Sequence, residues 1–308
     1  MSTQLDQPEL LVPLIEEVIH HACTGIAPDV RVLLEAAAKR EENDTARSVL
    51  LTMLENARLA YEQDKPACQS PGFPCVYVTY GGKTRLPDLR EVFGTAMRRC
   101  TEAGYLRPSM VHPLTRKNSG DNTGPGVPNF ELDFRPELDY ADFVVSFKAC
   151  GAELVNGVKV FTAATLGPNL AGLKKYVLDL VIKGRGIPCP PVGIGIGIGG
   201  QIDVAARLSR RAISTREWTY AHPDPEIARL EEELLEAVNA LGVGPGGTGG
   251  RTTALAVKIM MSYTHTAIAP VAVNFHCWVG RRAGVRIYED GRVERLFWRG
   301  QHDCPHTS

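Results

Sequence analysis

Gly193-Ile-Gly-Ile-Gly-Ile-Gly-Gly200 is the stretch of this sequence that says most about its fold. Successive side chains of a β-strand point to opposite faces, so the alternation places the isoleucines on one face and the glycines on the other. A strand with one bare face lets a second element pack closely against its backbone. The stretch therefore predicts a buried strand over 192–198 whose glycine face is covered by another part of the chain or lies against a bound group.

The same stretch is open to a second interpretation, as a dinucleotide-binding loop. Glycine loops of that kind open onto a helix, and a helix is expected here over 203–212. The stretch nevertheless lies far from the start of the chain, and no orderly series of strand–helix units follows it. Glu217 stands near the right distance for a ribose contact, but one acidic residue is weak support. Close packing is the favoured interpretation.

The rest of the chain mixes helical and extended patterns. Apolar residues at helical spacing predict helices over 10–23, 30–40, 44–61, 88–103, 170–183, 203–212 and 225–241. Runs of β-branched and aromatic residues predict strands at 76–80, 130–134, 143–148, 254–261 and 271–275, and a hairpin over 284–298 around Asp290-Gly291. Asp44 and Thr45 offer an N-cap for the third helix. We expect one α+β domain spanning 1–308, helix-rich near its N-terminus, with mixed or antiparallel sheets surrounded by helices and a disordered tail over 299–308.

Composition excludes several classes of function. The chain has 308 residues, 44% of them apolar and 22% charged, as in an ordinary soluble globular protein. Its formal net charge of -1 gives no electrostatic basis for binding nucleic acid or an anionic membrane. No apolar run approaches the roughly 18 residues that span a bilayer. The N-terminus lacks the basic start and apolar core of a signal peptide, so we expect a cytoplasmic protein.

Three of the eight cysteines stand in distinctive settings, far apart along the chain. Cys68 follows Pro-Ala, Cys189 is flanked by prolines, and Cys277 lies in Phe-His-Cys-Trp. Only folding could bring them together. Three thiolates that converge on one cavity can hold an iron–sulfur cluster with one iron left without a protein ligand. An open iron is a Lewis acid, which would suit a lyase acting on hydroxy acids.

The other five cysteines give no comparable signal. No C-x-x-C pair occurs anywhere in the chain, so zinc-ribbon and thioredoxin interpretations have no support. Thiols stay reduced in the cytoplasm, which argues against disulfides. Cys23, Cys100 and Cys304 are expected to be small buried apolar residues, while the roles of Cys75 and Cys150 stay open.

A few polar residues are candidates for chemistry, each beside a structural alternative. His265 precedes a predicted strand that runs toward Cys277, and both a catalytic and a structural role are open. His276 would point to the opposite face of that strand and is expected to be structural. Arg107 could clamp a carboxylate through two parallel hydrogen bonds, or be a solvated surface residue. The polar loop 118–128 could present backbone N–H groups to an anion or form an ordinary turn.

Several segments, taken in their order and spacing, form a specific combination. They are RLAYEQDKPACQ at 58–69, NSGDNTGPGVP at 118–128, CPP at 189–191, AARLSRRA at 205–212, LGVGPG at 241–246, CW at 277–278 and RR at 281–282. Over about residues 10–285, the chain resembles the α subunit of the class I fumarase and L-tartrate dehydratase family of iron–sulfur hydro-lyases. The resemblance implies the α+β fold of the fumarase class I α domain.

The resemblance also implies a site. A [4Fe–4S] cluster would be held by Cys68, Cys189 and Cys277, and its fourth iron would bind the hydroxyl and a carboxylate of the substrate. Polarisation by that iron would make the hydroxyl a leaving group while a base removes the proton on the adjacent carbon. By position, Arg107 resembles the family's substrate-carboxylate arginine and His265 the catalytic histidine near the substrate.

Further substrate contacts and a partner follow from the same resemblance. Gln69, Asn122, Thr123 and Lys148 are candidates for additional contacts with a small dicarboxylate. In single-chain family members a C-terminal β domain completes the site, and this chain ends without one. We therefore expect a separate β subunit, in an α2β2 assembly, or a homodimer.

The chain departs from the family's pattern at two places. The family's Cys-Gln-Asp-Thr-Gly is Cys68-Gln-Ser-Pro-Gly72 here, which removes a proton-handling aspartate near the substrate. Its glycine loop becomes Lys148-Ala-Cys-Gly-Ala-Glu153, where Ala149 and Cys150 would crowd a close backbone approach. The leading hypothesis is a hydro-lyase that reversibly dehydrates a small hydroxy-dicarboxylate. The alternatives are a changed reaction, such as an isomerase or another lyase of a biosynthetic pathway, and a non-catalytic cluster-binding or regulatory subunit.

Overall fold

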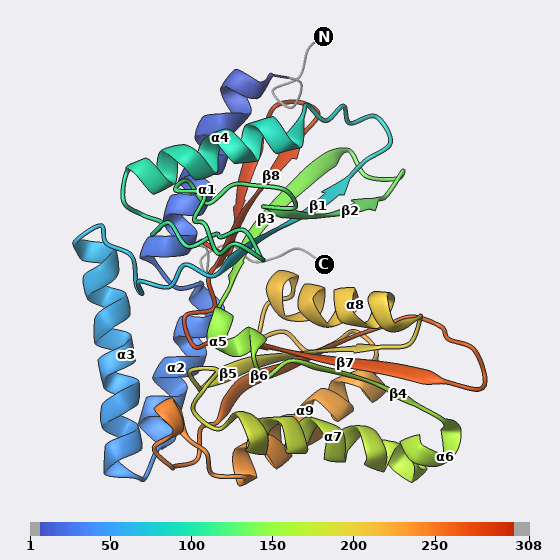
Figure 1. Ribbon diagram of the computed structural model, residues 1–308. Helices are drawn as coiled ribbons and strands as arrows, with labels where there is room; N and C mark the ends of the chain where they lie inside the picture. Colours follow the sequence, from blue (N-terminus) through green and yellow to red (C-terminus); the bar gives the residue numbers. More distant parts are fainter. Residues whose placement is uncertain (1–6, 299–308) are drawn as a thin grey trace. The chain divides into compact units, whose positions relative to one another are not determined.

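The computed structural model describes residues 7–298, so the tail predicted over 299–308 lies outside the described residues. The chain divides into two compact units. Unit 1 comprises Met1–Pro28, Asn56–Lys148 and Arg281–Ser308, and unit 2 comprises Asp29–Glu55 and Ala149–Gly280. Each unit contains a mixed β-sheet with helices, which confirms the α+β fold class (Figure 1). The expectation of a single domain stays a prediction, and each unit is described by itself.

Unit 1 is a five-stranded sheet of order β2-β1-β3-β8-β9. Its elements are α1 (Pro8–Thr24), β1 (Phe73–Tyr80), α4 (Leu89–Glu102), β2 (Asn129–Phe134), β3 (Tyr140–Lys148), β8 (Arg282–Tyr288) and β9 (Val293–Leu296). β1 pairs with β2 in parallel and with β3 antiparallel, and β3 pairs antiparallel with β8. Strands from the first half of the chain and strands from its C-terminal part therefore form one sheet.

The faces of this sheet follow the alternation of its strands. Val76 and Val78 of β1 belong to the main core, which also contains the buried side chains of α1 and α4. Cys75 and Tyr77 point to the other face and form a small cluster with Val144. Cys75 thus serves as a buried apolar residue of unit 1.

Unit 2 is a four-stranded sheet of order β4-β7-β5-β6. Its elements are α2 (Pro28–Arg40), α5 (Cys150–Glu153), β4 (Gly157–Phe161), α6 (Ala163–Leu166), α7 (Ala171–Gly184), β5 (Val192–Ile198), α8 (Ile202–Thr215), α9 (Pro225–Ala240), β6 (Ala254–Met261) and β7 (Ala269–His276). Helix α3 (Asp44–Glu62) begins in this unit and ends in unit 1. β5 pairs in parallel with β6 and antiparallel with β7, so the glycine stretch lies in the middle of the sheet.

The glycine face of β5 is covered by α8, as the sequence predicts. A Cβ atom added at Gly195 would lie 2.0 Å from the carbonyl oxygen of Ser209, and one at Gly197 would lie 2.0 Å from that of Ala205. Both distances are far inside van der Waals contact, so the backbone of α8 occupies the space that side chains would need. The glycines therefore serve packing, which favours that interpretation over a phosphate-binding loop.

The isoleucine side chains of β5 point to the opposite face of the sheet. Ile194 and Ile196 are fully buried in the core of unit 2 with the apolar side chains of α7 and α9. Figure 1 shows α8 on one side of this sheet and α7 and α9 on the other. One strand thus joins two different kinds of packing, a tight backbone contact on one face and an ordinary apolar core on the other.

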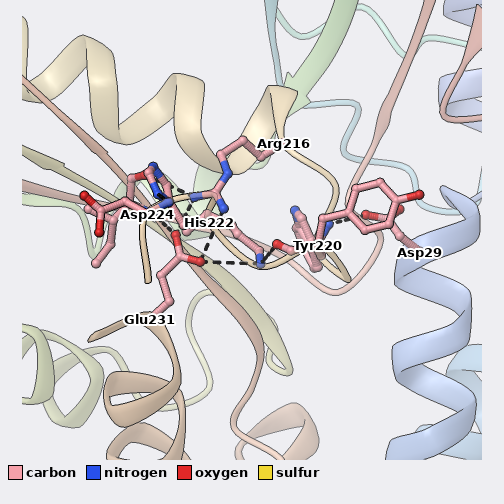
Figure 2. Close-up of polar contacts among 9 residues, drawn as sticks. Asp29, Arg216, Tyr220, His222, Asp224 and Glu231 are labelled. Atoms are coloured by element: carbon pink, nitrogen blue, oxygen red, sulfur yellow. Dashed lines mark hydrogen bonds and ion pairs between the residues drawn. The ribbon is translucent and has the colours of Figure 1, made fainter. Parts of the chain in front are cut away.

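A buried ion-pair network links the elements around α8 in unit 2 (Figure 2). Glu231 of α9 pairs with Arg216 and lies 3.8 Å from the ammonium of Lys258. Its carboxylate also accepts a hydrogen bond from the backbone of Ile259 at 2.7 Å. The Lys258 ammonium donates in turn to the carbonyl of Tyr220 at 2.7 Å. With these partners supplied by neighbouring elements, the network serves to fix α9 and the segment after α8 against β6.

The predicted elements are confirmed, with ends that shift by a few residues, and the hairpin turn falls at Asp290-Gly291. The N-cap of α3 was misplaced by one residue. Asn43, rather than Asp44 or Thr45, accepts the hydrogen bond from Ala46 N at 3.0 Å. Strand β4 was missed because its five residues carry a weak signal, and it exists through antiparallel pairing with β7.

One stretch of the described chain, Pro8–Arg40, is long and apolar enough by composition to cross a membrane. Of its most apolar window, 61% is buried inside the protein. The apolar residues of α1, such as Ile15 and Val18, belong to the core of unit 1. Core helices pass the same test, so the stretch is weak support for a membrane span.

Replacing Gly197 with alanine tests the glycine face. The new Cβ would collide with backbone rather than with a flexible side chain, so α8 must move. We expect a loss of about 3 kcal/mol in the free energy of unfolding, measured by urea denaturation. Gly94→Ala is the matched control, because its Cβ would meet only the end of Arg98 at 3.5 Å. The control should be neutral or stabilising by up to about 1 kcal/mol, and equal effects of the two changes would contradict the packing described.

Candidate functional site

Two of the three candidate cysteines lie at the same end of the sheet in unit 2. Cys189 comes three residues before β5, and Cys277 follows β7 directly. The strands run antiparallel with Gly193 opposite His276, so the start of β5 and the end of β7 coincide. A hydrogen bond from Trp278 N to the carbonyl of Cys189, at 3.2 Å, joins the two segments. The glycine strand thereby brings together two residues that the sequence separates widely.

Cys189 has an unusual backbone. Its φ of 55° lies in the left-handed region that residues with side chains rarely adopt. The residue is exposed, and its N–H donates to the carbonyl of Gly186 at 3.1 Å. Strained backbone of this kind is concentrated at functional sites, where the surrounding structure holds it in place. Cys189 thus presents its thiol from a fixed and exceptional conformation.

The end of β7, which leads to Cys277, is contacted by the segment that follows α5. The residue itself is 6% exposed. Asn156 accepts a hydrogen bond from the backbone of Phe275 at 2.8 Å, and its amide donates to Glu153 at 2.8 Å. Asn156 is a positioning residue that the sequence analysis missed, since its contact lies more than a hundred residues away along the chain.

The altered glycine loop forms the short helix α5 in this structure. A Cβ at Gly151 would lie 2.6 Å from the carbonyl of Ile187, two residues before Cys189. Gly151 therefore keeps the close backbone approach, whereas Cys150 is exposed. Ala149 lies at the N-cap of α5, and the expected crowding by Ala149 and Cys150 stays a prediction.

Cys68 belongs to unit 1, where it lies on an exposed loop after α3. The preceding residue, Ala67, donates to the carbonyl of Cys23 at 2.9 Å and accepts from Asn56 at 2.8 Å. The carbonyl of Cys68 accepts a hydrogen bond from Arg281 at 2.9 Å. Within residues 7–298, no group of three His, Cys, Asp or Glu side chains gathers as a metal site. The three candidate ligands are therefore placed as a pair in unit 2 and a single residue in unit 1.

The remaining cysteines of the core behave as expected from the sequence. Burial raises the pKa of the Cys23 thiol to about 12 and that of Cys100 to about 12. Both are neutral thiols at pH 7, unsuited to bind a metal. Cys304 lies outside the described residues.

Three candidate substrate residues of unit 1, Arg107, Asn122 and Thr123, belong to two neighbouring loop segments. Arg107 is exposed, and its carbonyl accepts a hydrogen bond from the amide of Asn122 at 3.1 Å. The side-chain oxygen of Asn122 accepts a hydrogen bond from Ser109 N at 2.9 Å, and its NH2 group also donates to the Thr101 hydroxyl at 3.0 Å. Asn122 is only 2% exposed. Thr123 donates its hydroxyl to Asp121 at 2.9 Å. Asn122 thus fixes the backbone beside Arg107, while Thr123 shapes its own turn.

Gln69 and Lys148 are the two other candidate substrate residues of unit 1. Gln69 is exposed beside Cys68, and Lys148 is 3% exposed at the end of β3, opposite Phe73 of β1. Neither placement tests a substrate contact, so both stay predictions.

The two histidines lie in unit 2. His265 is exposed in the loop between β6 and β7, and its Nδ1 accepts a hydrogen bond from Ala267 N at 3.2 Å. That bond leaves the Nε2 atom to carry the proton of the neutral ring. His276 is fully buried, with its ring 6.1 Å from that of Trp218. This burial agrees with the structural role expected for His276, and it leaves His265 as the exposed histidine beside β7.

Comparison with known proteins gives the family directly. Residues 12–286 match the protein family described as fumarate hydratase (Fumerase). A protein of Methanocaldococcus jannaschii, provisionally named L(+)-tartrate dehydratase subunit alpha, is 36% identical over 284 residues, covering 91% of this chain and 98% of the relative. L(+)-tartrate dehydratase subunit alpha of Escherichia coli strain K12 is 31% identical over 274 residues, covering 89% of each.

A further relative is longer. A provisionally named class I fumarate hydratase of Geobacillus stearothermophilus is 32% identical over 285 residues, which cover 91% of this chain and 55% of the relative. The name "subunit alpha" of the two tartrate dehydratases implies a partner subunit in those proteins. Matches that extend over nine-tenths of the chain identify it as a member of the class I fumarate hydratase and L(+)-tartrate dehydratase subunit alpha family of hydro-lyases.

Proposed function

We propose that this chain is the cluster-binding subunit of a [4Fe–4S] hydro-lyase that acts on a small hydroxy-dicarboxylate. The class I fumarase family is generally iron–sulfur dependent, and cysteine thiolates are the usual ligands of such clusters. The observation that carries the proposal is the pairing of Cys189 and Cys277 through the Trp278–Cys189 hydrogen bond. A cysteine held at φ 55°, whose carbonyl accepts a hydrogen bond from the residue after a second cysteine, suits a metal site better than a packing role.

Cys68 is the third ligand in this proposal. This assignment rests on the family resemblance, in which Cys68 matches the first cysteine ligand. The backbone of the Cys68 turn is fixed, because the carbonyl of Cys68 accepts a hydrogen bond from Arg281 at 2.9 Å.

The residues of the chain would bind and orient the substrate. When bound, the cluster would supply a Lewis-acidic iron that polarises the substrate hydroxyl. Arg107 would hold a substrate carboxylate through its planar guanidinium, with its backbone fixed by Asn122. His265 would present its Nε2 atom for proton transfer near the substrate. Gln69, exposed next to Cys68, is a further proposed contact.

A separate β subunit would complete the site. The relatives named subunit alpha align with this chain over most of their length, which supports an equivalent division of the enzyme here. An α2β2 assembly or a homodimer, and a cytoplasmic location, remain predictions. The retained candidate cysteines favour a working cluster, and the Ser70-Pro71 pair beside Cys68 favours a changed substrate or reaction.

The ligand set is tested by anaerobic reconstitution of single variants. Cys68→Ser, Cys189→Ser and Cys277→Ser should each lose the cluster, because a missing thiolate leaves too few ligands. Iron and sulfide analysis with electron paramagnetic resonance measures the loss. Cys150→Ser is the matched control, exposed on α5 in unit 2, and should keep the cluster. Loss of the cluster in that control would show that the altered loop supplies a ligand, and folded wild-type protein without iron would overturn the proposal.

Kinetics of the complex with its β subunit tests the two substrate residues. On a panel of unsaturated dicarboxylates, Arg107→Met should raise KM, because the carboxylate loses its bidentate partner. His265→Asn should lower kcat by about 10²–10⁴-fold, the usual contribution of a general acid or base. Arg116→Met, another exposed arginine of unit 1, should change neither. Wild-type rates in both His265→Asn and Arg107→Met would rule out these roles.

A further inference from the structure

Arg281 is a deeply buried side chain in unit 1, with 2% of its surface exposed. Its guanidinium donates to the carbonyl of Cys68 at 2.9 Å and to that of Pro71 at 3.1 Å, and it also contacts the carbonyl of Ser70. A planar guanidinium carries five donors in a rigid fork, so one side chain can fix several carbonyls at once. Arg281 thus holds the whole turn that carries Cys68.

The charge of Arg281 lacks an anionic partner in unit 1. Within residues 7–298, no carboxylate forms an ion pair with it, and its Nε–H has no acceptor. Burial raises the pKa of the Cys23 thiol to about 12, and this outweighs the charge of Arg281, which lowers that pKa. That thiol is neutral at pH 7. The three carbonyl dipoles offset part of the cost of burying a cation, and an anion would offset the remainder.

We propose that Arg281 is a positioning residue for the cluster, holding the Cys68 turn in its ligating conformation and balancing the negative charge of the thiolate-ligated site. This inference rests on the proposed function. A [4Fe–4S] cluster in its usual oxidised form, bound by three thiolates, carries a net negative charge. A buried cation hydrogen-bonded to the backbone of one ligand is therefore complementary to it, and such outer contacts tune both retention and potential.

The contact explains how the site tolerates its changed neighbours. All three acceptors are backbone carbonyls, which every residue possesses, proline included. The substitutions at Ser70 and Pro71 replace side chains without removing any acceptor of Arg281. The side chains of the turn can thus differ, and with them its contacts with a substrate, while the backbone of Cys68 stays in place.

Three variants of the full-length protein test this role. Arg281→Met removes the charge and the donors, and Arg281→Lys keeps the charge but loses the fork. Arg286→Met is the control, because Arg286 lies in β8 of the same unit and pairs with Asp142 at 2.7 and 2.9 Å. The readouts are deuterium uptake of residues 64–73 in cluster-free protein, the rate of iron loss to a chelator, and the cluster's reduction potential. Thermal melting confirms that each variant is folded.

Arg281→Met should raise deuterium uptake in residues 64–73 and speed iron loss about 10- to 100-fold. It should also lower the reduction potential, since reduction adds a negative charge that Arg281 no longer balances. Arg281→Lys should restore the potential but not the protection of the turn, and Arg286→Met should leave all three readouts at wild type. Wild-type uptake and iron retention in Arg281→Met would overturn the inference. Wild-type protein that takes up no iron would overturn the proposed function, while deuterium uptake would still decide whether Arg281 clamps the turn.

Discussion

The contact between the bare face of β5 and the backbone of α8 is the constraint on which unit 2 depends. Added Cβ atoms at Gly195 and Gly197 would lie 2.0 Å from carbonyl oxygens of α8, so no other residue fits there without moving the helix. With that face closed, the isoleucines turn to α7 and α9 and form the core. The antiparallel register of β5 with β7 then fixes which chain segments meet at the end of the sheet.

The candidate site follows from this arrangement. Because Gly193 stands opposite His276, the residues before β5 and after β7 are neighbours, and these are the segments of Cys189 and Cys277. Gly151 allows a third segment to approach the residues before Cys189. A Cβ atom added at Gly151 would lie 2.6 Å from the carbonyl oxygen of Ile187. In unit 1, Arg281 fixes the backbone of Cys68 by donating a hydrogen bond to its carbonyl. The segments of the three candidate ligands are thus held mainly through backbone contacts.

Much of this could be predicted from the sequence, for local reasons. The glycine alternation, the amphipathic helices and the hairpin at Asp290-Gly291 are signals carried by neighbouring residues. What the sequence did not reveal depends on contacts between distant segments. The cap at Asn43 competed with two equally good neighbours, β4 exists through its pairing with β7, and the contacts of Asn156 and Arg281 each span more than a hundred residues.

The central claim is that three cysteines hold a four-iron cluster with one iron open to substrate. Mössbauer spectroscopy of protein reconstituted with ⁵⁷Fe, recorded with and without a bound dicarboxylate, measures this most directly. The account predicts that one iron in four changes its isomer shift and quadrupole splitting when the dicarboxylate binds, while the other three keep theirs. Four irons that respond alike, or a spectrum without cluster iron in folded protein, would contradict it.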